Sequence, residues 1–220
     1  MGVSYNPKIV KDGLVLYLDA GNTKSYPGSG TTWTDLSGNG NNGTLNGPSY
    51  NSNLLGTFVL DGVDDYATLP TITLTNFTIQ IWCKITGSNL NMITNFSSNL
   101  FYEYLRFDGD TDSGRILLAY RENEQIVWSG ITGYNVLHQN VLQLFTITRD
   151  ETNTTLYFND VNKGSQSSYP YDFKFDVLFR RSNNTQYAAA DIHTFSAYNR
   201  VLSESEIQQN FNALRGRFGL

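Results

Sequence analysis

The chain has 220 residues, of which 40% are apolar and 14% aromatic, enough for one domain with a substantial core. Its net charge is −5, and its densest basic group is the pair Arg180 and Arg181, which excludes the concentrated basic surface that nucleic-acid binding requires. No stretch is long and apolar enough to insert into a membrane, and the single cysteine, Cys83, excludes an intrachain disulfide bond.

Residues 1–13 are interpreted as an N-terminal arm and residues 14–220 as one domain. The arm contains no recognisable export signal. We therefore expect a protein that acts where it is made, or that leaves the cell by assembly into a larger particle.

A short apolar strand is predicted at residues 14–19. Residues 20–53 are rich in Gly and Asn, and they follow neither the two-residue period of a strand nor the period of about 3.6 residues of a helix. This segment is expected to form a long loop, which the apolar residues Trp33, Leu36 and Leu45 attach to the rest of the domain.

Residues 77–85 show the clearest strand pattern of the chain. Apolar residues alternate there with Thr78, Gln80 and Trp82, so we expect one buried face, in which Cys83 is a small core residue. Further strands are expected at residues 57–60, 66–69, 92–96, 101–107, 115–120, 126–129, 142–149, 155–161, 175–180 and 189–197. Many short strands separated by turn residues favour a two-sheet sandwich, because each strand needs a second sheet to cover its apolar face.

One helix is predicted near the end of the chain. Ser203 and Glu206 match a capping box, in which each side chain satisfies a backbone N–H group at the helix start. The apolar residues that follow at helical spacing are Ile207, Phe211 and Leu214. We expect the helix to pack on the sandwich through Phe211 and to stop at Gly216.

Five stretches of the chain carry a family resemblance: residues 13–19 with 33–40, 58–66, 77–84, 144–160 and 198–203 leading into the helix. The most specific are DGVDDY at residues 61–66 and YNRVLSESEI at residues 198–207. The sequence resembles laminin G-like domains of the concanavalin A-like lectin/glucanase superfamily, of the type found in bacteriophage structural proteins. The resemblance implies an all-β fold, a two-sheet antiparallel jelly-roll sandwich with a short C-terminal helix.

The resemblance leaves the function open, because such domains include glycan binders, adhesion modules, pentraxin-like proteins, glycosidases and virion surface proteins. Glucanase relatives carry E-x-D-x-x-E on one strand, and none of the six glutamates of this chain begins that motif. Glu122 and Glu124 flank a turn and are interpreted as solvated. We therefore expect a protein that is not an enzyme.

Calcium is the one cofactor for which ligands are present. Asp64 and Asp65 are the predicted metal ligands, clustered with Asp61 in a glycine-containing turn, and Ca²⁺ selects carboxylate oxygens. The alternative is that these side chains only build the turn. Pentraxin-like relatives carry an acidic cluster where this chain has Arg180 and Arg181, so a pentraxin-type double calcium site is not expected.

Aromatic residues in the predicted loops and strands suggest a contact surface. We predict that Trp128, Tyr134, Tyr169 and Tyr171 form a surface for a carbohydrate or a protein partner, because exposed aromatic rings suit both. The alternative is that each ring is buried at a strand end.

The sequence thus predicts a non-catalytic, virion-associated structural module, such as a capsid decoration protein or a tail or fibre component on the particle surface. Its expected partners are other virion proteins, further copies of itself and host-surface glycans. The alternatives are a calcium-assisted carbohydrate-binding lectin and a glycoside hydrolase.

Overall fold

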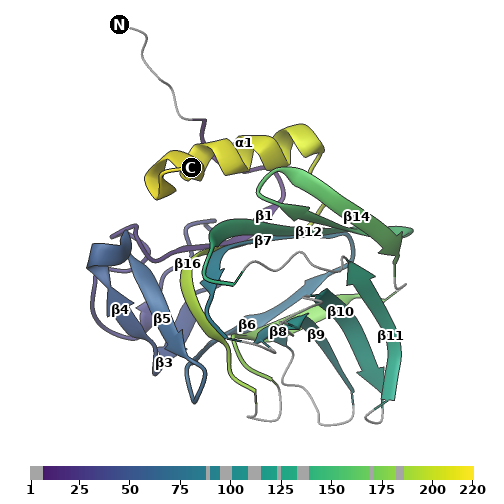
Figure 1. Ribbon diagram of the computed structural model, residues 1–220, viewed down its shortest axis with the longest axis horizontal. Coiled ribbons are helices and arrows are strands. Elements are labelled where there is room, and N and C mark those ends of the chain that lie inside the picture. Colours follow the sequence, from purple (N-terminus) through teal and green to yellow (C-terminus); the bar gives the residue numbers. More distant parts are fainter. Residues whose placement is uncertain are drawn as a thin grey trace, which may run out of the picture.

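The computed structural model describes residues 7–87, 90–94, 101–108, 115–122, 125–132, 139–168, 171–181 and 186–220. Within these residues the chain forms two antiparallel sheets packed face to face, with one α-helix on the outside (Figure 1). The predicted all-β jelly-roll sandwich with a short C-terminal helix is confirmed. In the described part of the chain, no helix has the length and apolarity needed to cross a bilayer.

Sheet A is built from strands that are distant in the sequence. Its order is β14 (Val161–Ser167), β13 (Asn153–Phe158), β12 (Leu142–Arg149), β7 (Phe77–Ile85), β16 (Ala189–Tyr198), β5 (Thr57–Asp61) and β4 (Ser49–Asn51). The strand β1 (Leu14–Asp19) also pairs with β16. The first and last long strands therefore lie side by side in this sheet.

Sheet B lies opposite. Its order is β11 (Gln125–Thr132), β10 (Arg115–Glu122), β9 (Phe101–Asp108), β8 (Leu90–Thr94), β15 (Phe173–Leu178), β6 (Tyr66–Leu74), β3 (Gly43–Asn46) and β2 (Thr32–Trp33). Each predicted strand corresponds to an observed one, with the predicted ends at β1, β7 and β12 and shifted ends elsewhere, except that residues 155–161 divide between β13 and β14. Asn159 adopts a left-handed backbone (φ 56°) there, which makes the hairpin turn.

Aromatic rings join the two sheets in the core. Phe107 of β9 lies 4.8 Å from Phe145 of β12 between ring centroids, and Trp33 of β2 lies 4.9 Å from Phe58 of β5. Such pairs contribute about 0.5–1.5 kcal/mol each beyond the burial of their area. Cys83 is also fully buried, as predicted.

The expectation that β7 buries one face only is wrong. Trp82 is 1% exposed and stacks on Phe211, with ring centroids 5.7 Å apart, and Gln80 is also buried. The helix α1 (Glu204–Arg215) covers this outer face of sheet A (Figure 1). The predicted docking of the helix through Phe211 is thereby confirmed.

The start of α1 also matches its prediction. The side chain of Ser203 accepts from the Glu206 amide and the Glu206 carboxylate accepts from the Ser203 amide, which is the expected capping box. The α-helix ends at Arg215 with Gly216 as its C-cap, as predicted, although the Gly216 backbone remains right-handed (φ −63°) and opens a 3₁₀ turn, η2 (Gly216–Phe218). The left-handed residue that ends this turn is Gly219 (φ 74°).

Residues 20–53 are more ordered than their composition predicts. They contain β2, β3, β4 and the start of the 3₁₀ turn η1 (Ser52–Leu54), and Trp33 is fully buried. Much of their order comes from Asp35, whose carboxylate accepts from the amides of Tyr17, Ser37 and Asn41 at 2.8–3.0 Å. A side chain that organises a loop in this way leaves no periodic pattern in the sequence.

The described part of the N-terminal arm, residues 7–13, packs against α1. Val10 is buried in a cluster with Tyr198, Leu202 and Ile207. Its amide donates to Asn210 Oδ1 at 2.7 Å, and its carbonyl accepts from the Tyr198 hydroxyl at 3.1 Å.

Candidate functional site

The turn at residues 61–65 joins β5 of sheet A to β6 of sheet B at the rim of the sandwich. Asp65 Oδ2 accepts from the Asp61 amide at 2.9 Å, and Asp61 Oδ1 accepts from the Val63 amide at 2.7 Å. Gly47, in a left-handed conformation (φ 90°), approaches Asp65 so closely that a Cβ atom there would collide with the carboxylate. These contacts fix the turn.

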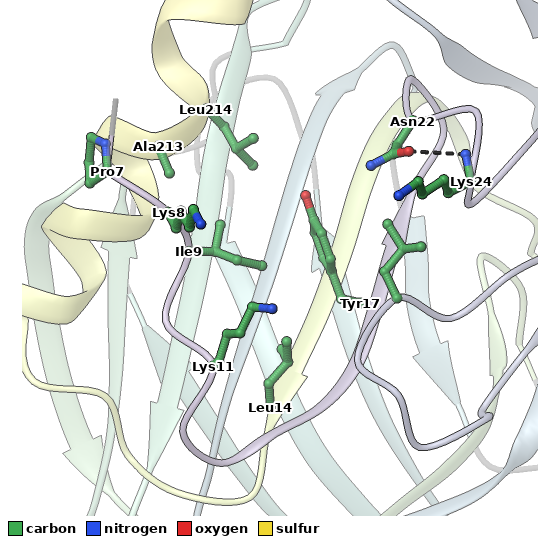
Figure 2. Close-up of a pocket in the computed structure, with 11 residues that line it drawn as sticks. Pro7, Lys8, Ile9, Lys11, Leu14, Tyr17, Asn22, Lys24, Ala213 and Leu214 are labelled. Carbon is green, nitrogen blue, oxygen red and sulfur yellow. Dashed lines mark hydrogen bonds between the residues drawn. The ribbon is translucent and has the colours of Figure 1, made fainter. Parts of the chain in front are cut away.

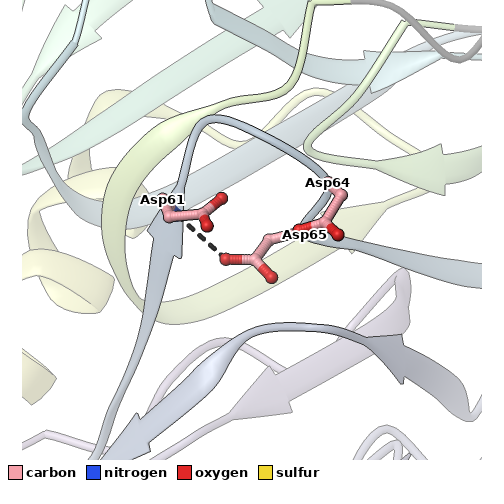
Figure 3. A group of neighbouring side chains, drawn as sticks. All are labelled: Asp61, Asp64 and Asp65. Carbon is pink, nitrogen blue, oxygen red and sulfur yellow. Dashed lines mark hydrogen bonds between the residues drawn. The ribbon is translucent and has the colours of Figure 1, made fainter.

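Three carboxylates converge at this turn (Figure 3). Each of Asp61, Asp64 and Asp65 offers an oxygen atom, and these atoms lie within 4.8 Å of one another. Asp65 is buried, whereas Asp61 and Asp64 are exposed. Burial is the main cause of the raised pKa of Asp65, to which the charges of Asp61 and Asp64 add, against the opposing hydrogen bond from the Asp61 amide.

This arrangement fits a hard divalent cation. Ca²⁺ takes oxygen ligands at about 2.3–2.6 Å, so two ligands of one ion lie at most about 5 Å apart. The structure thus brings the predicted ligands Asp64 and Asp65 together and adds Asp61 as a third. A cation here would also offset the mutual repulsion of the three carboxylates.

An arginine and two tyrosines lie beside the acidic turn. Tyr66 is the first residue of β6, and Arg180 and Tyr187 form a β-bridge. The guanidinium carbon of Arg180 lies 3.9 Å from the centroid of the Tyr66 ring, within the range of a cation–π contact. The Tyr66 and Tyr187 rings lie 6.3 Å apart. The Arg180 carbonyl accepts from Thr94 Oγ1 at 2.9 Å, which anchors the group to β8. We call Tyr66, Arg180 and Tyr187 the rim cluster.

A cavity of about 240 Å³ adjoins the rim cluster on sheet B. Its lining residues are Thr68, Leu69, Asp176, Val177 and Arg180. Because side chains alternate along β6, with Ala67 and Leu69 buried, Tyr66 and Thr68 share the outer face of the sheet. The half-buried ring of Tyr66, the largely buried side chain of Arg180 (7% exposed) and the carboxylates thus lie along one edge of the molecule.

Sequence reasoning missed the rim cluster. In the sequence, Arg180 stands out only as part of a basic pair that replaces the acidic cluster of pentraxin-like relatives. The alternation in residues 66–69 already places Tyr66 on the outer face. The contact between Tyr66 and Arg180 joins residues more than 100 positions apart, for which the sequence carries no local signal.

The predicted aromatic surface is described in part. Trp128 lies in β11, but its side chain is outside the described residues, as are Tyr134 and Tyr169 entirely. Tyr171 is 59% exposed, and its carbonyl accepts from Arg149 Nη2 at 2.6 Å. One of the four predicted side chains is therefore placed at the surface.

The described candidates for nucleophilic or acid–base chemistry are buried. Burial raises the pKa of the Cys83 thiol. Burial, helped by the charge of Arg217, lowers the pKa of His193 to about 4, and its ring packs edge-on against Phe218 at 5.0 Å. Of the pair considered for glycoside hydrolysis, Glu122 ends β10 with its side chain outside the described residues, and Glu124 lies outside them.

Comparison with solved structures shows the same fold in glycan-related and toxin domains. Domain 4 of AbnA, an extracellular arabinanase from Geobacillus stearothermophilus, in complex with arabinotriose, is 15% identical with a TM-score of 0.68, over 90% of this chain and 97% of that one. The botulinum neurotoxin type G receptor-binding domain is 20% identical with a TM-score of 0.62, over 91% and 51%. A Trypanosoma rangeli sialidase, in complex with 2,3-difluorosialic acid, is 14% identical with a TM-score of 0.66, over 93% and 33%.

This chain therefore spans about half of the toxin domain and a third of the sialidase, and at these identities the likeness concerns the fold. A search of curated protein sequences found no significant match. A laminin G-type family model, described as the concanavalin A-like lectin/glucanases superfamily, matches residues 61–208, which is more than half of the chain. The match begins at the acidic turn and extends into the C-terminal helix, and the chain belongs to this family.

Proposed function

We propose that this chain is a non-catalytic glycan-binding module, and that the rim cluster with its adjoining cavity is the binding surface. The observation that carries the proposal is the Tyr66 ring held by Arg180 at 3.9 Å beside three carboxylates. Sugars bind to such surfaces because their apolar ring faces pack on aromatic rings, while their hydroxyl groups pair with charged side chains. Both tyrosines are half-buried, so part of each ring remains accessible.

The family and its fold neighbours support a glycan ligand. The arabinanase domain covers almost the same length as this chain, and it is in complex with a trisaccharide. A cavity of about 240 Å³ beside an aromatic and arginine pair suits one or two sugar rings better than a long buried ligand, because small-molecule pockets usually exceed about 300 Å³.

The roles of the carboxylates support binding rather than hydrolysis. A glycosidase needs two carboxyl groups that flank the same bond and exchange protons with the substrate. Here Asp65 is 5% exposed and accepts from the Asp61 amide, while Asp61 accepts from the Val63 amide. If the chain were a hydrolase instead, it would release reducing sugar from a panel of arabinans, β-glucans and galactans.

Calcium assistance is a second proposal, carried by the oxygen atoms of Asp61, Asp64 and Asp65 within 4.8 Å of one another. We expect Ca²⁺ to raise the unfolding temperature of the wild-type protein and to have a much smaller effect on Asp64→Asn. Asp172→Asn is a matched control, because Asp172 is exposed and lies outside the acidic turn. Equal calcium responses of the two variants would exclude the turn as the site.

The glycan proposal is tested on a glycan array, with and without calcium, followed by titration of the best ligand. Tyr66→Ala should abolish binding, whereas Tyr171→Ala, which removes an exposed ring elsewhere, should leave it unchanged. The reverse result would move the site to the predicted aromatic surface. An array without any bound glycan would remove the proposal altogether.

We further propose that this glycan-binding module is part of a virion, and this role has a separate test. If the chain is a capsid decoration or tail component, it should copurify with intact particles and remain attached through a density gradient. Its absence from purified particles would refute this role without affecting glycan binding.

A further inference from the structure

A second and larger cavity, of about 420 Å³, opens on the opposite side of the molecule from sheet B. It lies between residues 7–14, the segment that follows β1, and the last turn of α1 (Figure 2). Its volume falls within the range of about 300–1,000 Å³ that is usual for small-molecule sites. Its apolar wall is aliphatic and includes Ile9, Leu14, Leu36 and Leu214.

The charges around this cavity have one sign. Three of the six lysines of the chain, Lys8, Lys11 and Lys24, line it, although the net charge of the chain is −5. Figure 2 shows the side chains of Lys11 and Lys24 extending from two sides toward Tyr17. Among the described residues, none of these three lysines forms an ion pair.

Two of the acidic residues near the cavity form ion pairs with arginines. Asp12 pairs with Arg200 and Asp19 pairs with Arg217, each at an N–O distance of 2.8 Å. Arg200 also pairs with Glu206, and the buried carboxylate of Asp35 is held by the amides of Tyr17, Ser37 and Asn41. None of these carboxylates uses a lysine of the cavity as its partner, so the ammonium groups of Lys8, Lys11 and Lys24 remain open to a ligand. An anion that enters the cavity would meet this charge without displacing an existing partner.

Two polar groups add directional contacts. Asn22 Oδ1 accepts from the Lys24 amide at 3.0 Å, which fixes the side chain, and its amide nitrogen points toward Tyr17 (Figure 2). The Tyr17 hydroxyl donates to Asp19 Oδ2 at 3.1 Å. Burial, with the charge of Asp19, raises the pKa of Tyr17, so the hydroxyl keeps its proton and its oxygen remains an acceptor.

We propose that this cavity binds a small organic anion, namely a carboxylate carried on an aliphatic body. The aliphatic wall takes the body, and Lys8, Lys11 and Lys24 take the carboxylate. An inorganic anion would leave the apolar wall unused, and a neutral lipid would leave the lysines unused. The inference is independent of glycan binding, which the opposite sheet is proposed to perform.

The test uses octanoate as the probe. Octanamide has the same aliphatic body without the charge, and acetate has the same charge without the long aliphatic body. Titrations followed by ¹⁵N-edited NMR should show saturable shifts at the amides of Ile9, Leu36 and Leu214 with octanoate, and weaker binding of both comparison compounds. Lys11→Gln and Lys24→Gln should each weaken octanoate binding about two- to fivefold, as expected for exposed charge pairs. Lys163→Gln, an exposed lysine on β14, should leave it unchanged.

A second variant tests the aliphatic wall. Ala213 is a half-buried lining residue on α1, and Ala213→Phe should fill the cavity and abolish octanoate binding while glycan binding persists. The spectrum of each variant reports whether it is folded. Equal affinity for octanoate and octanamide would overturn the role of the lysines. Octanoate shifts that are absent, or that map away from the cavity, would overturn the site.

Discussion

Asn210 provides the sharpest test of how the ends of the chain are held. Its side chain is 3% exposed; Oδ1 accepts from the Val10 amide at 2.7 Å, and Nδ2 donates to Gln80 Oε1 at 2.7 Å and to the Tyr198 hydroxyl at 3.0 Å. Asn210→Ala leaves the Val10 amide and Gln80 Oε1 without this partner, which costs about 1–3 kcal/mol for each buried group. The higher helix propensity of Ala offsets about 0.5 kcal/mol. The expected net loss of unfolding free energy is about 2–5 kcal/mol.

Urea unfolding at neutral pH measures this loss. Asn212→Ala is the matched control, because it changes the same residue type two positions away on α1, and the Asn212 side chain forms no hydrogen bond among the described residues. It should change stability by less than about 0.5 kcal/mol. Amide hydrogen exchange adds a local measurement, since Asn210→Ala should increase exchange at Val10 more than at the centre of β7.

The reasoning would be refuted if the two variants had the same stability. Such a result would mean that water replaces the Asn210 side chain at no cost, and that the buried contacts with Val10 and Gln80 do not hold the arm. A loss of stability without faster amide exchange at Val10 would mean that Asn210 stabilises the helix and does not hold the arm.

Three further predictions concern the turn and the titrating groups. Gly47→Ala should destabilise the protein by more than the roughly 1–2 kcal/mol of left-handed backbone strain, because the new Cβ atom would collide with Asp65. Gly38→Ala is the control, since Gly38 has a similar φ but open space around it, and it should cost only the backbone strain. Thermal unfolding measures both losses. Hydrogen bonds from Arg200 lower the pKa of Glu206 from 4.5 to about 2, so its stabilisation, complete above pH 4.5, should disappear as the pH falls toward 2, and Glu206→Gln should remove this dependence in urea titrations. Burial lowers the pKa of His193 from 6.5 to about 4, so its neutral form stabilises the fold above pH 6.5 and stability should fall between pH 6.5 and 4, but not in His193→Gln.

The features that the sequence predicts well are those with a local signal. The alternation at residues 77–85 identifies β7, and Ser203 with Glu206 identifies the start of α1. The outer face of β7 was mispredicted because its cover comes from Phe211 and Asn210, far along the chain. Alternation of apolar and polar residues identifies a strand, but it carries no information about which other element covers the outer face of that strand.

The candidate site shows the same division. The acidic turn at residues 61–65 could be recognised because its carboxylates are close in sequence. The rim cluster could not, because Tyr66 and Arg180 meet only through the pairing of β6 with β15. The lysines of the second cavity likewise come from two segments, Lys8 and Lys11 from the arm and Lys24 from the loop after β1, which line one cavity only in the folded chain.

Both terminal segments pack on the sheet A side of the molecule, so its two faces differ in their distance from the chain ends. The arm, whose Lys8 carbonyl accepts from Gln209 of α1, lies on the helix side of sheet A, as does the C-terminal end of the chain, and sheet B faces the other way (Figure 1). Any support linked to either of these segments, whether a neighbouring domain, a particle or a sensor chip, would present the rim cluster outward. Immobilisation through a terminal tag should therefore leave the proposed glycan surface accessible, whereas coupling through lysines would obstruct the second cavity.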